Sequence, residues 1–232
     1  MENYEKETIA AIATALSDSG IGIVRISGSE ALEIADRVYK GKETITEVPT
    51  HTIHYGHVMD GDETVDEVLV MVMRGPRTFT GEDTVEINCH GGTYVVSRVL
   101  ETVLKAGARP AEPGEFTKRA FLNGKMDLSQ AEAVIDLINS ENEYALQSSV
   151  SQLKGSVKSA INELRSKILY HTAFIETALD DPEHISVDGY GEILKGVSEE
   201  IIEKLQKLID SADDGRIMKE GIPVSYTHLR AH

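Results

Sequence analysis

The segment 85–90 carries the polar groups best suited to bind a ligand. Its apolar and polar residues alternate with a period of two, which predicts a β-strand with one apolar face. The opposite face carries a carboxylate, an amide and an imidazole, contributed by Glu86, Asn88 and His90. Gly91 and Gly92 then open a predicted helix, whose first N–H groups can hold an anion. A solvent-facing strand followed by a flexible turn accounts for the same pattern without a ligand.

A second candidate, Arg25, interrupts the apolar run Ile21–Ile26. It shares a predicted strand face with Ile21 and Ile23, so its guanidinium needs a partner or a route to the rim. A carboxylate or an anionic ligand would satisfy it through two hydrogen bonds. A surface arginine that extends into solvent is the alternative.

The segment Pro110–Leu128 is the third candidate. Two prolines and a glycine predict an irregular loop, which concentrates Lys118, Arg119 and Lys125 in an otherwise acidic chain. Loops on a rigid scaffold often carry binding residues. A plain linker between two domains explains the segment equally well.

No metal site, catalytic group or phosphate-binding loop is predicted. Residues three apart on a strand alternate between its faces, so three histidines do not converge on one metal: His51, His54 and His57. Cys89 and His90 are neighbours on a predicted strand and point in opposite directions, so the thiol is expected in the core. Neither Gly-Lys pair, at 41–42 or at 124–125, fits the nucleotide-binding pattern G-x-x-x-x-G-K-[ST].

Short strands alternate with helices over the first 120 residues, which predicts an α+β fold. The predicted strands are Thr8–Ala13, Ile21–Ile26, Thr52–Met59, Val65–Met73 and Thr84–Cys89. The acidic turn 60–63 is typical of a hairpin. Helical spacing follows the turn at Gly28, and a second helix starts at Thr93 and stops at Gly107.

The second half of the chain is predicted to be helical. The run Ser129–Glu132 predicts a capping box at the start of one helix. Apolar residues then step by fours and threes from Leu146 to Ile168, as in one long helix packed in a bundle, and Asp181-Pro182 ends it. A last helix covers Ile193–Ile209. These apolar stripes must be buried on each other or on a partner.

Composition narrows the class of protein. The 232 residues include 23 Lys and Arg against 39 Asp and Glu, for a net charge of −16, and this balance argues against direct binding of nucleic-acid phosphates. A single cysteine excludes an internal disulfide framework. The acidic N-terminus lacks a secretory signal, and no run approaches the roughly 18 apolar residues of a membrane span. We expect a soluble, cytoplasmic protein.

Four segments together resemble the MnmE (TrmE) family of tRNA modification GTPases: 20–28, 79–86, 90–92 and 109–125. The resemblance implies an α+β N-terminal domain, a mixed sheet with flanking helices like the tetrahydrofolate-binding domain of aminomethyltransferases. An all-α helical segment follows it, and a Ras-like G domain is inserted into the helical domain.

The resemblance also implies domain boundaries. Residues 1–120 form the folate-binding and dimerisation domain, and residues 121–215 form an incomplete helical domain. Residues 216–224 begin a G domain that is otherwise missing, and residues 225–232 read as a non-native tail. GTP, potassium and magnesium would belong to the missing G domain, so the fragment alone is expected to lack catalysis although the parent protein is a GTP hydrolase.

The implied function is modification of carbon 5 of the wobble uridine, U34, in tRNA. The implied donor is 5-formyl- or 5,10-methylene-tetrahydrofolate, and the implied partners are a second copy of the chain, the flavoprotein MnmG (GidA) and tRNA held by the complex; no membrane is involved. A non-catalytic module for dimerisation and MnmG docking is one alternative. A stand-alone folate-dependent one-carbon transferase is another.

The resemblance places the family's folate contacts on Arg25, Glu86 and Lys125, and Asn88, His90 and Gly91 are further candidates. A carboxylate such as Glu86 suits the N–H groups of a pterin, and Arg25 or Lys125 suits the carboxylates of the glutamate tail. These residues are expected to bind and position the folate more than to act as acid–base catalysts.

Overall fold

A computed structural model describes residues 7–220 of the chain, which divide into two compact units. The first unit ends at Met126 and the second begins at Asp127. Each is described separately below. A mixed sheet with flanking helices makes up the first unit and helices make up the second, which confirms the predicted fold class.

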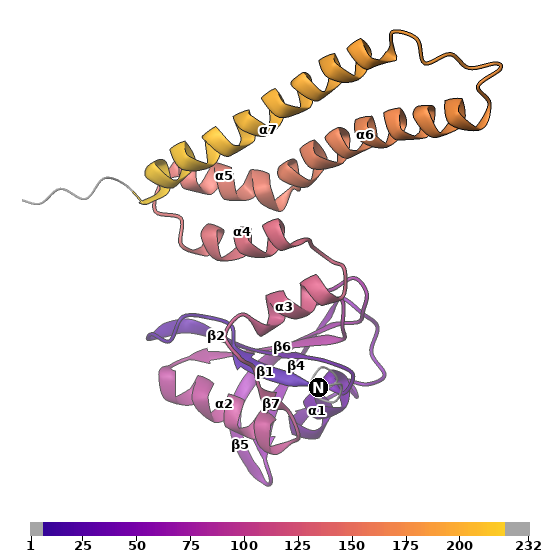
Figure 1. The fold of residues 1–232 in the computed structure, drawn as a ribbon. Helices are drawn as coiled ribbons and strands as arrows, with labels where there is room; N and C mark the ends of the chain where they lie inside the picture. Colours follow the sequence, from indigo (N-terminus) through magenta and orange to yellow (C-terminus); the bar gives the residue numbers. More distant parts are fainter. Residues whose placement is uncertain (1–6, 221–232) are drawn as a thin grey trace, which may run out of the picture. The chain divides into compact units, whose positions relative to one another are not determined.

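The first unit is built on a seven-stranded sheet in the order β3-β4-β5-β6-β2-β1-β7 (Figure 1). The strands are β1 (Ile9–Ile12), β2 (Ser19–Ser27), β3 (Tyr39–Gly41), β4 (Thr52–Asp60), β5 (Glu63–Met73), β6 (Thr84–Gly91) and β7 (Arg109–Pro110). All neighbours are antiparallel except β1 and β7, which run parallel. Strands β4 and β5 form the predicted hairpin, in which Asp60 pairs with Glu63 across a two-residue turn.

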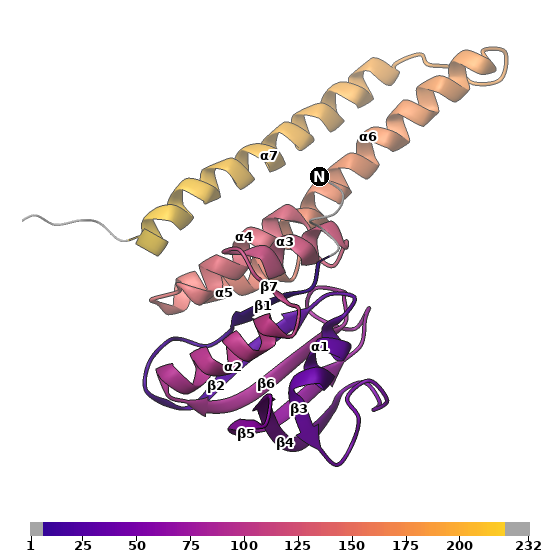
Figure 2. The ribbon, with the colours of Figure 1, turned by 90° about the horizontal axis from the view of Figure 1, so that it is seen from below.

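Two helices cover one face of this sheet, α1 (Ala31–Val38) and α2 (Thr93–Lys105), and both are visible in Figure 2. Fully buried side chains from the sheet and from the two helices form the core: Val24, Ile26, Ile34, Val85, Ile87 and Val99. The alternation predicted for residues 85–90 is confirmed, because the odd-numbered residues of β6 are buried in this core. Their even-numbered neighbours therefore lie on the opposite face.

A third helix, α3 (Glu115–Leu122), lies on that opposite side of the sheet (Figure 1). It begins after Gly114, whose φ of +75° lies in the left-handed region. The segment Pro110–Leu128, predicted as an irregular loop, thus contains a helix. Both prolines precede residues 115–122, so they do not prevent these residues from forming a helix. The side chains of Asn123 and Lys125 donate to carbonyls of the loop before β6, and the first compact unit extends to Met126.

The second unit contains α4 (Leu128–Ile138), α5 (Glu143–Leu153), α6 (Ser156–Asp180) and α7 (Tyr190–Glu220). A capping box does open α4, but its residues are Asp127 and Gln130, so the predicted box Ser129–Glu132 is wrong. Asp127 accepts a hydrogen bond from the Gln130 N–H at 2.9 Å, and the Gln130 side chain accepts one from the Asp127 N–H.

The predicted single helix from Leu146 to Ile168 is two helices. Gly155 takes a φ of +79° between α5 and α6, and its N–H donates to the Gln152 carbonyl at 2.8 Å, which ends α5. The predicted stop before Pro182 is confirmed, since α6 ends at Asp180. Helix α7 runs on to Glu220, so residues 216–220, predicted to begin a G domain, are helical. Residues 221–232, which include the predicted non-native tail, lie outside the described residues.

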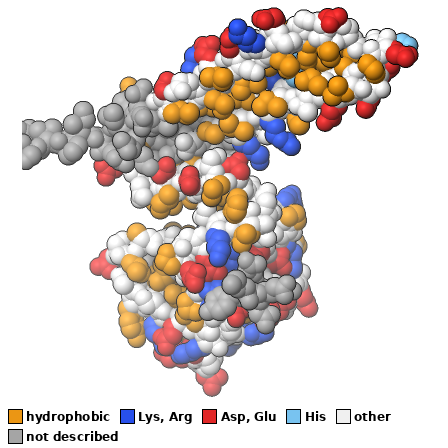
Figure 3. Space-filling model, in the orientation of Figure 1, with side chains coloured by type: hydrophobic (Ala, Val, Ile, Leu, Met, Phe, Trp, Pro, Cys, Tyr) orange, Lys and Arg blue, Asp and Glu red, His pale blue; other side chains and the backbone are white. Residues whose placement is uncertain are grey.

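Large apolar side chains of the second unit are exposed, which Figure 3 shows as orange groups on the helices. They include Ile138, Ile161, Leu169, Leu179, Ile193 and Ile202. The predicted mutual burial of the apolar stripes is therefore only partial within the described part of the chain. Among residues 7–220, no helix is both long enough and apolar enough to span a membrane.

Candidate functional site

Two of the predicted binding residues, Arg25 and Glu86, face each other across neighbouring strands. The antiparallel register of β2 and β6 pairs their Cα positions directly. The Nε and Nη2 atoms of Arg25 lie 2.8 Å and 2.7 Å from Oε1 of Glu86. Their side chains are 28% and 14% exposed, so the pair is partly shielded and still reachable. It is a charge-assisted contact.

Two aromatic rings flank this pair. The guanidinium carbon of Arg25 lies 5.8 Å from the centre of the Phe79 ring and 5.6 Å from that of the Phe116 ring. Phe79 belongs to the loop between β5 and β6, and Phe116 belongs to α3. The Phe79 side chain is partly exposed, so the pair borders an aromatic surface that solvent reaches. Both phenylalanines lie within the family motifs 79–86 and 109–125.

Lys125 lies on the turn after α3 and approaches the same loop. Its ammonium donates to the Pro76 carbonyl at 2.8 Å, and its methylene stem lies beside Gly81. The loop 76–82 thus connects Lys125 to the ring of Phe79. The structure brings Arg25 and Glu86 into direct contact and attaches Lys125 to the loop beside them.

The remaining candidates form contacts of their own. The Asn88 amide donates to the Leu69 carbonyl at 3.2 Å. Both Nδ1 and the backbone N–H of His90 bond to the carboxylate of Asp66, at 2.7 Å and 2.8 Å. That hydrogen bond and the charge of Asp66 raise the pKa of His90.

Gly91 serves packing. A Cβ atom there would lie 2.2 Å from the Ser19 hydroxyl and 2.4 Å from the Ser19 carbonyl oxygen, so a larger residue would force the strands apart. Asn88 and His90 share the face of Glu86 but lie two and four residues further along β6, about 7 and 13 Å away at the usual rise of a strand.

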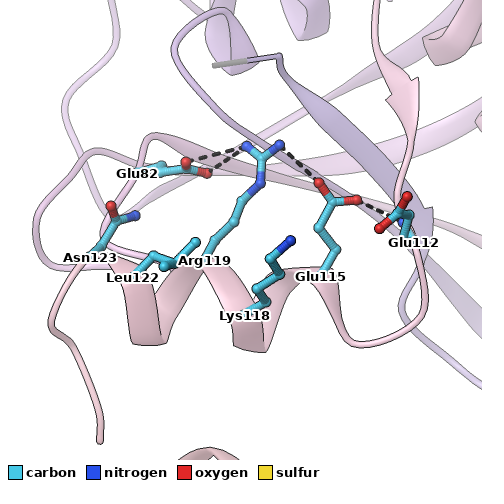
Figure 4. A pocket seen from close by; sticks show the side chains of 7 residues that line it. All are labelled: Glu82, Glu112, Glu115, Lys118, Arg119, Leu122 and Asn123. Atoms are coloured by element: carbon cyan, nitrogen blue, oxygen red, sulfur yellow. Dashed lines mark hydrogen bonds and ion pairs between the residues drawn. The ribbon is translucent and has the colours of Figure 1, made fainter. Parts of the chain in front are cut away.

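A buried ionic network that sequence analysis missed joins α3 to the rest of the unit (Figure 4). Nη1 of Arg119 lies 3.2 Å and 3.3 Å from the carboxylate oxygens of Glu82, and its Nη2 lies 3.1 Å from Glu115. Arg109 bonds to the same Glu115 carboxylate through two nitrogens. Burial alone would raise the pKa of Glu115, but hydrogen bonds from Arg109, the Glu112 N–H and Arg119 outweigh it and lower that pKa to about 2.

A cavity of about 230 Å³ lies beside this network. Its lining residues are Glu82, Glu112, Glu115, Lys118, Arg119, Leu122 and Asn123 (Figure 4). Most of its charged groups already bond to each other. A cavity lined by side chains that already bond to each other has the character of a structural centre more than of a ligand pocket.

Cys89 is buried, as predicted, and its thiol donates to the Gly22 carbonyl at 3.4 Å. Burial and the charge of Asp66 raise its pKa to about 11, so the reactive thiolate is scarce. Among the described residues, no three His, Cys, Asp or Glu side chains group as metal ligands would. The arrangement at Arg25 and Glu86 is a partly exposed ion pair beside two aromatic rings.

Comparison with known proteins covers nearly the whole chain. The profile of the family described as "GTP-binding protein TrmE N-terminus" matches residues 8–125, and that of the "MnmE helical domain" matches residues 128–223. A "tRNA modification GTPase MnmE" of Lachnoclostridium phytofermentans is 54% identical over 93% of this chain, and one of Staphylococcus aureus strain JH9 is 49% identical over the same share. The chain spans 48% of each, about half the length of these curated relatives.

Proposed function

The chain belongs to the MnmE (TrmE) family of tRNA modification GTPases, and we propose that its first unit binds a tetrahydrofolate derivative at the Arg25–Glu86 pair. The observation that carries the proposal is this partly exposed pair, whose guanidinium lies close to the rings of Phe79 and Phe116. When bound, the folate would supply a one-carbon unit. The chain's own residues bind and orient it.

The chemistry of the residues fits such a ligand. Glu86 uses Oε1 for Arg25, and its carboxylate retains acceptor capacity for the N–H groups of a pterin. An aromatic ring beside the pair suits the flat face of the pterin. Arg25 or Lys125 suits the carboxylates at the other end of the folate. Asn88, His90 and Gly91 are expected to contribute less to folate binding, because each already contacts a residue of a neighbouring strand or loop.

The activity of the whole protein extends this proposal. We assign to it the modification of carbon 5 of the wobble uridine in tRNA with 5-formyl- or 5,10-methylene-tetrahydrofolate, together with the flavoprotein MnmG. GTP, potassium and magnesium would act in a G domain, and the complex would work in the cytoplasm. The names of the relatives support the tRNA and GTPase part of this proposal. Because the net charge of −16 disfavours direct binding of RNA phosphates by this chain, the RNA contacts are assigned to the partner and to other domains.

Self-association of the first unit is part of the proposal. Its support is an exposed apolar strip on the sheet face of Glu86, in which Tyr55 on β4 pairs with Leu69 on β5. Their side chains are 57% and 47% exposed, and the neighbouring Ile53 is 58% exposed. Apolar strips of this kind mark interaction surfaces. Leu69→Glu should therefore shift the chain from dimer to monomer in sedimentation velocity, and an unchanged distribution would contradict this part.

Titration calorimetry with 5-formyltetrahydrofolate tests the folate proposal. We expect binding by the unmodified chain and a loss of about 10- to 100-fold in affinity in Glu86→Gln and in Arg25→Ala, since each removes a charge-assisted hydrogen bond. Glu33→Gln on the exposed side of α1 is the matched control and should bind normally. Unchanged affinity in both site variants would contradict the site. A chain that dimerises and yet releases no heat with the folate would favour a docking module instead.

A further inference from the structure

Arg119 is a buried side chain of the family motif 109–125 with three bonded partners, and the folate proposal gives it no role. Its side chain is 6% exposed. Besides Glu115 and Glu82, it bonds to the Glu7 carbonyl at 2.7 Å. One guanidinium thus ties α3 to the segment before β1 and to the loop before β6.

Glu82, which bonds to Arg119, also contacts β2, the strand that carries Arg25. The Ser27 hydroxyl donates to the Glu82 carboxylate at 2.8 Å and lies 2.8 Å from the Thr80 hydroxyl. Ser27 is two residues beyond Arg25 on the same face of β2. The loop carrying Phe79 is therefore held from the sheet by Ser27 and from α3 by Arg119.

A second set of bonds fixes the same loop. The Asn123 amide donates to the Thr80 carbonyl at 2.8 Å, next to Phe79, and Lys125 donates to the Pro76 carbonyl. Both residues follow α3, whose first turn carries Phe116. A displacement of α3 relative to the loop would separate the two rings that flank Arg25.

We propose that Arg119 is a positioning residue for the Arg25–Glu86 site: through Glu82 it sets the distance between α3 and the loop 76–82, and so keeps the rings of Phe79 and Phe116 beside the Arg25 guanidinium. This inference rests on the proposed folate site for its ligand. Arg119 itself touches no ligand. Its contribution is the preorganisation of groups that do.

A purely structural role is the competing explanation, and Arg109 provides the matched control. Arg109 is bonded to the same Glu115 and to Glu7 at 2.9 Å, so Arg109→Lys perturbs the network at those two carboxylates. Arg119→Lys perturbs it at Glu115 and, unlike Arg109→Lys, at Glu82. Glu82→Gln keeps the contacts of Arg119 with Glu115 and Glu7, and it serves as the second variant if Arg119→Lys does not fold.

The experiment measures two quantities in the full chain. The first is the affinity for 5-formyltetrahydrofolate, which we expect to weaken about tenfold in Arg119→Lys and Glu82→Gln and by less than about twofold in Arg109→Lys. The second needs no ligand: the proton NMR signal of the Arg25 Nε–H group, which reports the two rings, should move in the first two variants and stay in place in the third.

The two readouts separate the inference from the folate proposal. If the unmodified chain binds no folate, the folate proposal fails and the Arg25 signal alone decides the positioning role. A signal that moves only when Glu82 or Arg119 is changed supports it. A signal that stays in place in both variants, or that moves equally in Arg109→Lys, overturns it.

Discussion

Replacing Glu115 with glutamine should destabilise the first unit in a way that depends on pH. In the folded chain the pKa of Glu115 is about 2 against an ordinary value of 4.5, because the hydrogen bonds from Arg109, Glu112 and Arg119 outweigh its burial. A carboxyl whose folded pKa is depressed stabilises the fold above its unfolded pKa. That stabilisation is lost as the pH falls through the folded pKa.

The magnitude follows from the two pKa values. At 1.36 kcal/mol for each pKa unit, the ionised Glu115 contributes about 3 kcal/mol at pH 7. About 1.4 kcal/mol should remain at pH 3 and about 0.4 kcal/mol at pH 2, and near pH 1 the contribution should vanish. Glutamine resembles the protonated acid, so Glu115→Gln should lose this amount at each pH. Its side chain is 9% exposed, which keeps solvent screening small.

Urea unfolding followed by the NMR signals of buried residues in the first unit, such as Ile26 and Val85, measures the free energy of unfolding of that unit. The difference between the unmodified chain and Glu115→Gln should shrink steadily from pH 5 to pH 3. Glu112→Gln, three residues away in the same cavity lining, is the control and should cost less than about 0.5 kcal/mol. A difference that is absent at pH 7, or constant with pH, would refute the reasoning.

Three further predictions concern the rest of the first unit. Cys89 should react with a disulfide reagent at pH 8 only after unfolding, because its burial and a pKa of about 11 keep the thiolate scarce; fast reaction of the folded chain would contradict this. Asp66→Asn should lower the pKa of His90 toward its ordinary value of 6.5 in an NMR titration, and an unmoved titration curve would remove Asp66 as the cause. Gly28→Ala should lower the melting temperature by several degrees, because φ is +140° and the new Cβ would lie 2.6 Å from the Thr8 hydroxyl oxygen; an unchanged melting temperature would show that the strand adapts.

Local patterns predicted the elements of the first unit well. Period-two alternation identified the buried and open faces of β6, and the acidic turn 60–63 identified the β4–β5 hairpin. Both signals arise between residues close in sequence, where side-chain direction follows directly from backbone geometry. The same alternation indicated that Arg25 needs a partner on its own face.

Long-range partners could not be predicted in the same way. Arg25 and Glu86 are 61 positions apart, and their pairing depends on the register of β2 against β6. The ion pair of Arg119 with Glu82 likewise depends on where α3 lies against the sheet. No local pattern in either segment encodes these distances.

The helical half shows a different limit. The spacing of apolar residues continues through Lys154 and Gly155, so the heptad pattern predicts one helix where the chain forms α5 and α6. The break depends on the left-handed conformation of Gly155, which hydrophobic spacing does not report. The capping box was misplaced because Ser129 and Asp127 both have side chains suited to a cap; in the fold Asp127 accepts bonds from both Ser129 and Gln130.

Chemical-shift mapping of the isotope-labelled chain with 5-formyltetrahydrofolate tests the central claim most directly, because it locates the ligand without a mutation. We predict that the first signals to shift are the Arg25 Nε–H group, the amide of Glu86 and the rings of Phe79 and Phe116. Signals of Glu112 and Lys118, in the neighbouring cavity, should change little. Shifts centred on that cavity, or none at a saturating concentration of the folate, would contradict the claim that the Arg25–Glu86 pair is the binding site.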